Sequence, residues 1–194
     1  GDKVRNHAKA IIHAWYPGAF GGLAVANILA GVANPGGKLP VTIYRGDHNL
    51  PDFEDYSMLG RTYRYIDGDA LYPFGFGLSY TEFEYSDMTL AIIGENEVKV
   101  TLNVKNIGNM SGDEVVQIYV EDCESTVVTP TVLLKDFKRI SLDPNEEKEV
   151  EFNLGFDAFK LLNQDYEWVV EPGTFIIYAA SSSRDLRLSA EITL

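Results

Sequence analysis

The sequence contains one cysteine, Cys123, and only three histidines. A lone cysteine excludes an internal disulfide framework and any metal site built from cysteines. The histidines (His7, His13 and His48) do not share the spacing of a metal-binding pair, so we expect no metal site. The chain also lacks a Gly-x-Ser-x-Gly nucleophile elbow and a glycine-rich phosphate loop. These absences argue against a serine hydrolase of the α/β type and against a nucleotide-binding enzyme.

Positive charge is also scarce, because 16 Lys and Arg face 29 Asp and Glu, for a net charge of −13. Residues 1–84 carry 7 basic and 9 acidic side chains, whereas residues 85–194 carry 9 and 20. An acidic surface repels phosphate groups, and no apolar run is long enough to span a bilayer. We therefore expect neither nucleic acid nor a membrane as a partner. No leader is visible and the chain does not begin with Met, so the compartment stays open between bacterial cytoplasm and secretion.

The first 84 residues alternate between strand-like and helix-like patterns. A short apolar run predicts a strand over residues 8–15, and apolar residues at helical spacing predict a helix over residues 20–29 that ends before Gly31. A second strand is expected over residues 39–44. One strand–helix–strand unit belongs to a parallel sheet with helical cover, and it cannot close a core by itself. We therefore expect residues 1–84 to be an incomplete α/β domain.

From about residue 85 the hydrophobic pattern changes to the period of two that is typical of half-buried strands. Turn signals separate short strands every 8–12 residues, which indicates an antiparallel β-sandwich of immunoglobulin-like type over residues 85–194. A helical turn is expected within residues 156–162, and the turn at Pro172-Gly173 predicts a hairpin between two of the strands. The predicted strands cover residues 97–105, 114–120, 135–142, 147–154, 166–170, 174–180 and 186–194.

Residues 60–81 gather aromatic rings and two arginines around a glycine and proline scaffold. Flat amphipathic rings suit sugars, but they serve equally well in a tightly packed crossing between domains. For residues 71–81 the alternating glycines favour packing, whereas for residues 56–65 both interpretations stay open. Three acids just before this stretch, Asp52, Glu54 and Asp55, are the only carboxylates placed to join it in glycoside chemistry. A solvated loop explains three such acids more simply than catalysis does.

Several long motifs in a fixed order resemble glycoside hydrolase family 3, whose members include β-glucosidases and β-xylosidases. The first half resembles the carboxy-terminal part of that family through 16-YPG-18, 34-NPGGKLPVT-42, 53-FEDYSM-58, 60-GRTYRY-65 and 71-LYPFGFGLSYT-81. The second half resembles the fibronectin type III-like domain that often follows, through 112-GDEVVQIYV-120, 134-LKDFKR-139, 168-WVVEPGTF-175 and 181-SSSRD-185. The resemblance implies a mixed fold, with residues 1–84 as the tail of an α/β sandwich domain and residues 85–194 as a fibronectin type III-like β-sandwich.

The resemblance also implies a chemistry that this chain cannot complete. Members are retaining exo-glycosidases that release terminal β-linked sugars without a cofactor. Their nucleophilic aspartate lies on a separate (α/β)8 barrel, and their acid/base glutamate usually lies in an upstream part of the α/β sandwich domain. No catalytic residue is therefore transferred to this chain, and we expect the 194 residues alone to be inactive on a β-glucoside or β-xyloside. Tyr56 and Arg61 are the candidates for residues adjacent to the substrate in the intact enzyme.

A second interpretation is a non-catalytic module that binds polysaccharide or a protein partner. Such a module would expose aromatic rings in a row across one face of a sheet. Four aromatic residues lie on the predicted strands, namely Tyr119, Tyr166, Trp168 and Tyr178, and on strands we expect such residues in the core.

Overall fold

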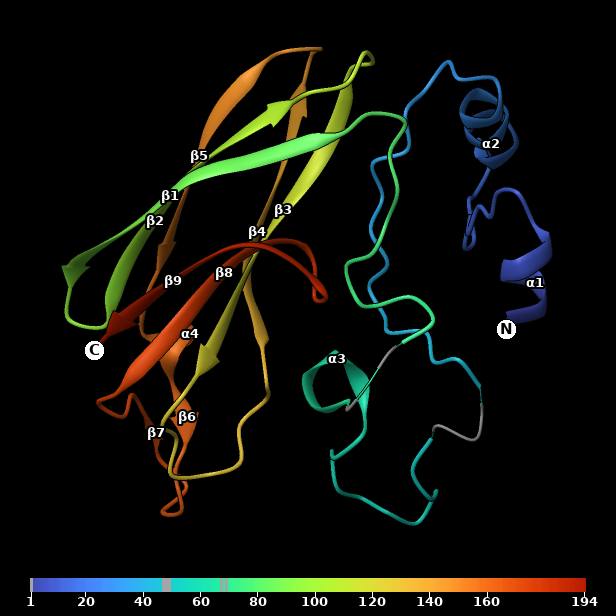
Figure 1. The fold of residues 1–194 in the computed structure, drawn as a ribbon. Coiled ribbons are helices and arrows are strands. Elements are labelled where there is room, and N and C mark those ends of the chain that lie inside the picture. Colours follow the sequence, from blue (N-terminus) through green and yellow to red (C-terminus); the bar gives the residue numbers. More distant parts are fainter. Residues whose placement is uncertain (1, 47–49, 67, 69) are drawn as a thin grey trace.

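The computed structural model describes residues 2–46, 50–66, 68 and 70–194 (Figure 1). Its second half is a β-sandwich, and the described residues before Phe83 run along one side of that sandwich and include three short helices. The mixed fold expected from the sequence, a partial α/β tail followed by an all-β sandwich, is confirmed.

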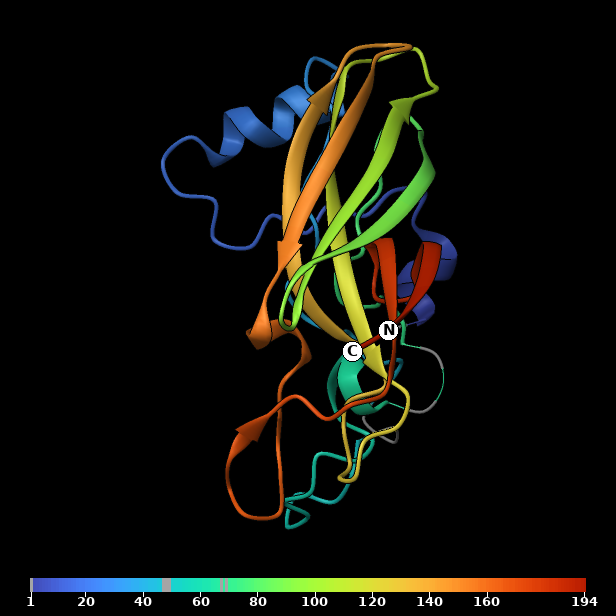
Figure 2. The ribbon, with the colours of Figure 1, turned by 90° about the vertical axis from the view of Figure 1, so that its left-hand side faces the viewer.

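Two antiparallel sheets make up the sandwich, as the view in Figure 2 also shows. A three-stranded sheet has the order β1–β2–β5, with β1 at Phe83–Gly94, β2 at Glu97–Asn106 and β5 at Glu147–Leu154. A four-stranded sheet has the order β4–β3–β8–β9, with strands at Leu133–Leu142, Gly112–Asp122, Thr174–Ser182 and Asp185–Thr193. A single-turn helix, α4 (Phe156–Phe159), follows β5 within the stretch where a helical turn was expected.

The core lies between these two sheets, and the period of two explains it. Alternate residues of β2 point inward and are fully buried, from Val98 through Leu102 to Val104. The facing sheet contributes alternate residues of β3 and β8, such as Ile118 and Ile177. Burial of one apolar face of each sheet excludes water from the whole interior, which makes this cluster the main source of stability.

Two details of the sandwich differ from the sequence-based expectation. Strand β1 was not predicted, because its register on β2 shifts between Ser86 and Thr89, where Asp87 has a φ of +54°, and this irregularity breaks the alternation. The hairpin expected around Pro172-Gly173 is wrong. Strand β7 (Trp168–Val169) pairs with β6 (Leu161–Leu162) in a small separate sheet, while β8 pairs with β3 and β9.

In the first region the expected helix is confirmed as α2 (Gly21–Leu29), and Gly31 with a φ of +69° follows its end. A further helix, α1 (Asp2–His7), precedes it. The strand expected over residues 8–15 is wrong, since that stretch is exposed and has no regular secondary structure. The strand expected over residues 39–44 is reduced to one bridge between Ile43 and Tyr72. Strand-like sequences form strands only when neighbouring strands satisfy their backbone groups, and the described residues contain no partner strands for these two.

Residues 71–81 cross from the first region into the sandwich, and most of them pack closely, as expected, whereas Leu78 and Tyr80 are exposed. A Cβ atom at Gly77 would overlap the carbonyl of Gly37, and one at Gly75 would overlap the side-chain amide of Gln117. At the end of the crossing, the Thr81 hydroxyl donates to the fully buried side chain of Asn106 over 2.6 Å. These close contacts join the two regions without a flexible linker.

Candidate functional site

Residues 51–61, which we call the aromatic loop, lie beside the lower end of the sandwich in Figure 1 and lead into the short helix α3 (Thr62–Tyr65). The Arg61 guanidinium organises this loop from within. Its Nε donates to the Ser57 carbonyl over 3.0 Å, and Nη2 donates to the carbonyls of Asp52 at 3.0 Å and Asp55 at 2.5 Å. A guanidinium is a planar fork of donors, so one side chain can hold three carbonyls that converge on it.

Tyr56 lies in the middle of the aromatic loop, and the structure leaves it 93% exposed. Phe53 in the same loop is 94% exposed. The loop therefore exposes the rings of Phe53 and Tyr56 to solvent, while the Arg61 guanidinium is hydrogen-bonded to the loop backbone. This arrangement separates the two candidates named from the sequence, because Tyr56 is free for contact and Arg61 supports the loop that carries it.

The acids of the aromatic loop also serve its conformation. The Asp52 carboxylate accepts from the Glu54 amide at 2.9 Å, and the Asp55 carboxylate accepts from the Ser57 amide at 2.8 Å. The bond from the Ser57 backbone N–H lowers the pKa of Asp55. Both contacts are turns in which an aspartate caps its own backbone two residues later. A general acid needs a raised pKa, so this environment does not suit Asp55 for that role.

Within the motif 60-GRTYRY-65, Tyr63 is buried, Tyr65 is half-buried and Arg64 is exposed. Tyr63 is 9% exposed, and its ring stacks on Phe74 with centroids 4.4 Å apart. The same ring meets Tyr119 of β3 edge-on at 5.9 Å. The sequence left substrate contact and packing open for residues 56–65; in the structure Tyr56 is exposed and Tyr63 is packed.

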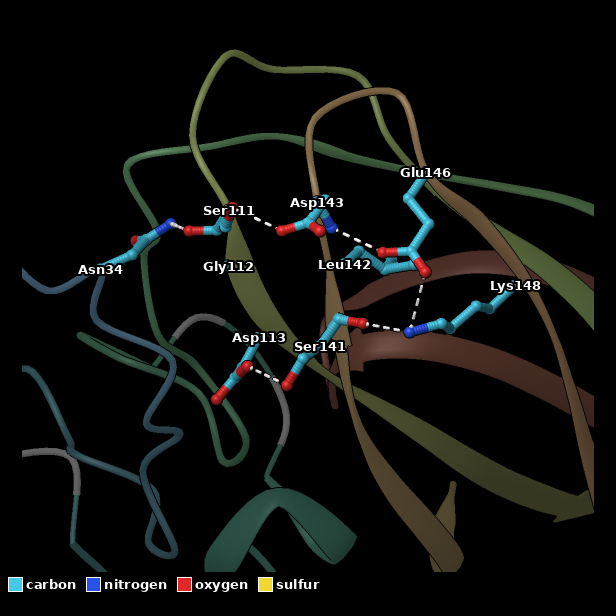
Figure 3. A pocket seen from close by; sticks show the side chains of 9 residues that line it. All are labelled: Asn34, Ser111, Gly112, Asp113, Ser141, Leu142, Asp143, Glu146 and Lys148. Atoms are coloured by element: carbon cyan, nitrogen blue, oxygen red, sulfur yellow. Dashed lines mark hydrogen bonds and ion pairs between the residues drawn. The ribbon is translucent and has the colours of Figure 1, made fainter.

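A hollow of about 390 Å³ lies where the turn at Asn34 meets the ends of β3, β4 and β5 (Figure 3). Its polar side chains are paired with each other. The Ser111 hydroxyl donates to Asp143 at 2.7 Å, the Ser141 hydroxyl donates to Asp113 at 2.5 Å, and Lys148 pairs with Glu146 at 3.0 Å. Because these side chains bond to each other, we interpret the hollow as a polar contact between the two regions and not as a catalytic site.

Among the described residues no group of three or more His, Cys, Asp and Glu side chains converges as a metal site. His13 lies outside any strand and stacks on Trp15 with ring centroids 4.1 Å apart. His48 falls outside the described residues. Within the same part of the chain, no helix has the length and apolarity needed to cross a membrane.

The aromatic residues of the sandwich fall into two groups. Tyr119 is fully buried, and the hydroxyl of the partly buried Tyr178 donates to Glu121 at 2.7 Å. Tyr166 and Trp168, in contrast, are 85% and 57% exposed on the β6–β7 hairpin, so the core position expected for them is wrong. Trp168 begins the two-residue strand β7, Tyr166 lies in the turn before it, and this hairpin belongs to neither main sheet, which removes both residues from the core. Lys160 lies over the Trp168 ring at 4.7 Å.

Comparison with known proteins gives two family matches that follow each other along the chain. Residues 2–80 match the glycosyl hydrolase family 3 C-terminal domain, and residues 114–183 match a fibronectin type III-like domain. Both matches fall where the sequence motifs lie, and the second lies within the sandwich.

Among curated relatives, a beta-xylosidase from Formosa agariphila is 43% identical over 93% of this chain, and a beta-glucosidase from Bacteroides ovatus is 37% identical over 92%. The beta-glucosidase 3B of Thermotoga neapolitana, solved in complex with glucose, superposes over 100% of this chain with a TM-score of 0.90 and 31% identity. The chain spans only about a quarter of the length of the curated relatives, 26% and 27% for these two, and 29% of the solved structure. The chain belongs to glycoside hydrolase family 3, and it carries the tail of that family's C-terminal α/β domain followed by a fibronectin type III-like domain.

Proposed function

We propose that this chain is part of a retaining exo-β-glycosidase that hydrolyses terminal β-linked glucose or xylose in oligosaccharides and plant polysaccharides. The observation that carries the proposal is the match of more than nine tenths of the chain to a beta-xylosidase and a beta-glucosidase that extend well beyond it. Retaining hydrolysis needs a carboxylate nucleophile and a carboxylic acid about 5 Å apart across the scissile bond. Both groups would come from the (α/β)8 barrel and from the remainder of the α/β domain.

Within that enzyme, residues 1–84 would complete the α/β domain and residues 85–194 would support it. We propose that the aromatic loop forms part of the rim of the substrate site. The exposure of Tyr56 supports a direct contact with a sugar, and the bonds of Arg61 inside the loop support a role in holding Tyr56 in place. A phenol ring offers an apolar face for the C–H groups of a sugar and a hydroxyl for hydrogen bonding.

The first test uses the 194-residue chain alone with p-nitrophenyl β-glucoside and p-nitrophenyl β-xyloside. We expect no hydrolysis, because neither catalytic carboxylate is present, and hydrolysis by the purified chain would overturn the proposal. In the intact enzyme, Tyr56→Ala should raise KM for a disaccharide about three- to tenfold with a smaller change in kcat, whereas Tyr56→Phe should keep most of the affinity. An unchanged KM for Tyr56→Ala would remove Tyr56 from the site.

A non-catalytic carbohydrate-binding role is the second candidate, and the β6–β7 hairpin favours it. Tyr166 and Trp168 are exposed there on a small sheet separate from the sandwich. Affinity electrophoresis in gels that contain xylan or soluble cellulose tests this role. Retardation of the 194-residue chain that disappears in Trp168→Ala would support binding by the hairpin, and equal migration with and without polysaccharide would exclude it.

A further inference from the structure

The segment that follows the aromatic loop is fastened to the β-sandwich at Tyr63. The buried Tyr63 ring lies between Phe74 and Tyr119, and its hydroxyl accepts a hydrogen bond from the Leu134 amide of β4 over 3.2 Å. Aromatic pairs in stacked and edge-on arrangements add attraction beyond the area that they bury. Tyr63 is therefore the side chain that anchors this segment to the sandwich.

Hydrogen bonds to the backbone of residues 64–68 strengthen this attachment to the sandwich. The Thr131 amide, just before β4, donates to the Arg64 carbonyl over 2.9 Å. The Arg184 guanidinium, at the turn between β8 and β9, donates to the carbonyls of Ile66 and Gly68 at 3.1 Å each. Three separate parts of the sandwich thus hold one short stretch of chain. Bonds that join residues more than 60 positions apart in sequence restrict the stretch to one conformation.

The anchored segment follows the aromatic loop directly, because Arg61 precedes Tyr63 by only two residues. Arg61 holds three carbonyls of the loop, as described above. Between the two, Thr62 has a φ of +55°, and its amide donates to the Tyr44 hydroxyl over 2.6 Å. A non-glycine residue in the left-handed region persists only when its surroundings hold it there. Tyr63, Thr62 and Arg61 therefore form a continuous path from the sandwich to the loop that presents Tyr56.

We propose that Tyr63 and Arg184 are positioning residues, through which the fibronectin type III-like sandwich sets the conformation of the aromatic loop and the orientation of Tyr56 in the active enzyme. Neither residue touches the substrate in this proposal. The first part, control of the loop, depends only on the contacts within this chain. The second part, an effect on substrate binding, rests on the proposed function of Tyr56.

Hydrogen exchange in the 194-residue chain tests the first part, with amides 54–62 as the reporters. Tyr63→Leu should accelerate exchange there about tenfold or more, and Arg184→Met by a smaller factor, while the amides of β2 and β5 stay protected. Tyr63→Phe keeps the ring and should change exchange by less than about threefold. Arg187→Met is the matched control, because Arg187 on β9 donates to the Phe83 carbonyl and to Asp185, within the sandwich, rather than to residues 51–68.

Exchange at amides 54–62 that stays within about twofold of the wild type in Tyr63→Leu would overturn the proposal. So would equal acceleration in Arg187→Met. If Tyr63→Leu lowers protection in β2 as well, the comparison of Tyr63→Phe with Arg184→Met decides instead, since both keep the core of the sandwich.

Steady-state kinetics in the intact enzyme test the second part. Tyr63→Leu should raise KM for a disaccharide by about the factor seen in Tyr56→Ala, with kcat for a p-nitrophenyl monosaccharide nearly unchanged, and Tyr63→Phe should restore KM. The double variant Tyr56→Ala/Tyr63→Leu should show no further increase over the single variants. Additive increases would contradict action through Tyr56. An inactive wild-type enzyme would defeat the proposed glycosidase function, and the exchange experiment would still decide whether the sandwich controls the loop.

Discussion

Replacement of Asn106 by aspartate should destabilise the β-sandwich more than any change of similar size on its surface. The Asn106 side chain is fully buried at the end of β2 and uses its complete hydrogen-bonding capacity. Its oxygen accepts from the Thr81 hydroxyl at 2.6 Å and from the Gly108 amide at 3.0 Å. Its nitrogen donates to the carbonyls of Met110 at 2.9 Å and Leu142 at 3.0 Å.

Aspartate has the same shape but cannot donate when ionised, so two carbonyl oxygens would face a buried carboxylate. Loss of two bonds at about 1 kcal/mol each, with about 1–3 kcal/mol for the groups left unsatisfied, predicts a total loss of about 3–5 kcal/mol at pH 7. With a slope of about 2 kcal/mol per molar urea, the unfolding midpoint should fall by about 1.5–2.5 M. Urea titration followed by circular dichroism measures this shift.

The loss should also depend on pH in a defined direction. Burial and the two carbonyls would raise the folded-state pKa of the new carboxyl above its unfolded value of about 4. The folded variant then binds more protons than the unfolded chain above pH 4, so its stability falls as the pH rises towards 7. The deficit relative to the wild type should therefore widen from pH 4 to pH 7.

Asn153→Asp is the matched control, since Asn153 is exposed on β5 opposite Lys99, and it should change stability by less than about 0.5 kcal/mol. A loss of less than about 1 kcal/mol for Asn106→Asp at pH 7, or a loss that does not vary with pH, would refute the reasoning.

Three further predictions concern contacts that join the regions or lie beside them. The Lys38–Glu114 pair is 3.0 Å long with side chains 13% and 7% exposed, so Lys38→Met should cost about 3–5 kcal/mol in urea unfolding, and the added change Glu114→Gln should recover most of it. Burial, with the neighbouring charges of Lys160 and Arg64, lowers the pKa of Lys135 to about 8, so the free energy of unfolding should rise with pH between about 8 and 10. In urea titrations Lys135→Met should therefore stabilise the chain at pH 7, with a gain that shrinks above pH 8. Gly77→Ala should cost about 1–3 kcal/mol because its Cβ would overlap a backbone carbonyl, whereas Gly22→Ala in α2 has open space around it and should be neutral or stabilising in the same titration.

Periodicity located most of the sandwich correctly because its strands bury one face each. The alternation of Val98, Val100, Leu102 and Val104 predicts β2 almost to the residue, since every second side chain enters the core. The same reasoning missed β1, where the shift after Ser86 moves the inward face by one residue. The same reasoning also placed Trp168 in the core, because the sequence of a short strand cannot show whether that strand joins the main sheets or a separate hairpin.

The sequence indicated which segment holds the candidate residues, but not which of their side chains are buried, exposed or hydrogen-bonded. The motifs 53-FEDYSM-58 and 60-GRTYRY-65 marked the segment that holds Tyr56 and Arg61, yet the contacts of its residues depend on where the chain folds. Tyr63 is buried because Phe74 and Tyr119 surround it, and Arg61 is occupied because three carbonyls of its own loop turn towards it. No spacing in the sequence carries that information.

The sequence by itself determined the family, the β-sandwich and most of the close packing at residues 71–81, because motifs and hydrophobic periods are local properties of the chain. Only the tertiary structure decided which rings of the aromatic stretch face outward, which parts of the sandwich bond to residues 63–68, and that residues 8–15 and 39–44 form no sheet here. Those outcomes depend on partners far away in sequence, and a strand or a loop takes its final form only when such partners bury its side chains and satisfy its backbone.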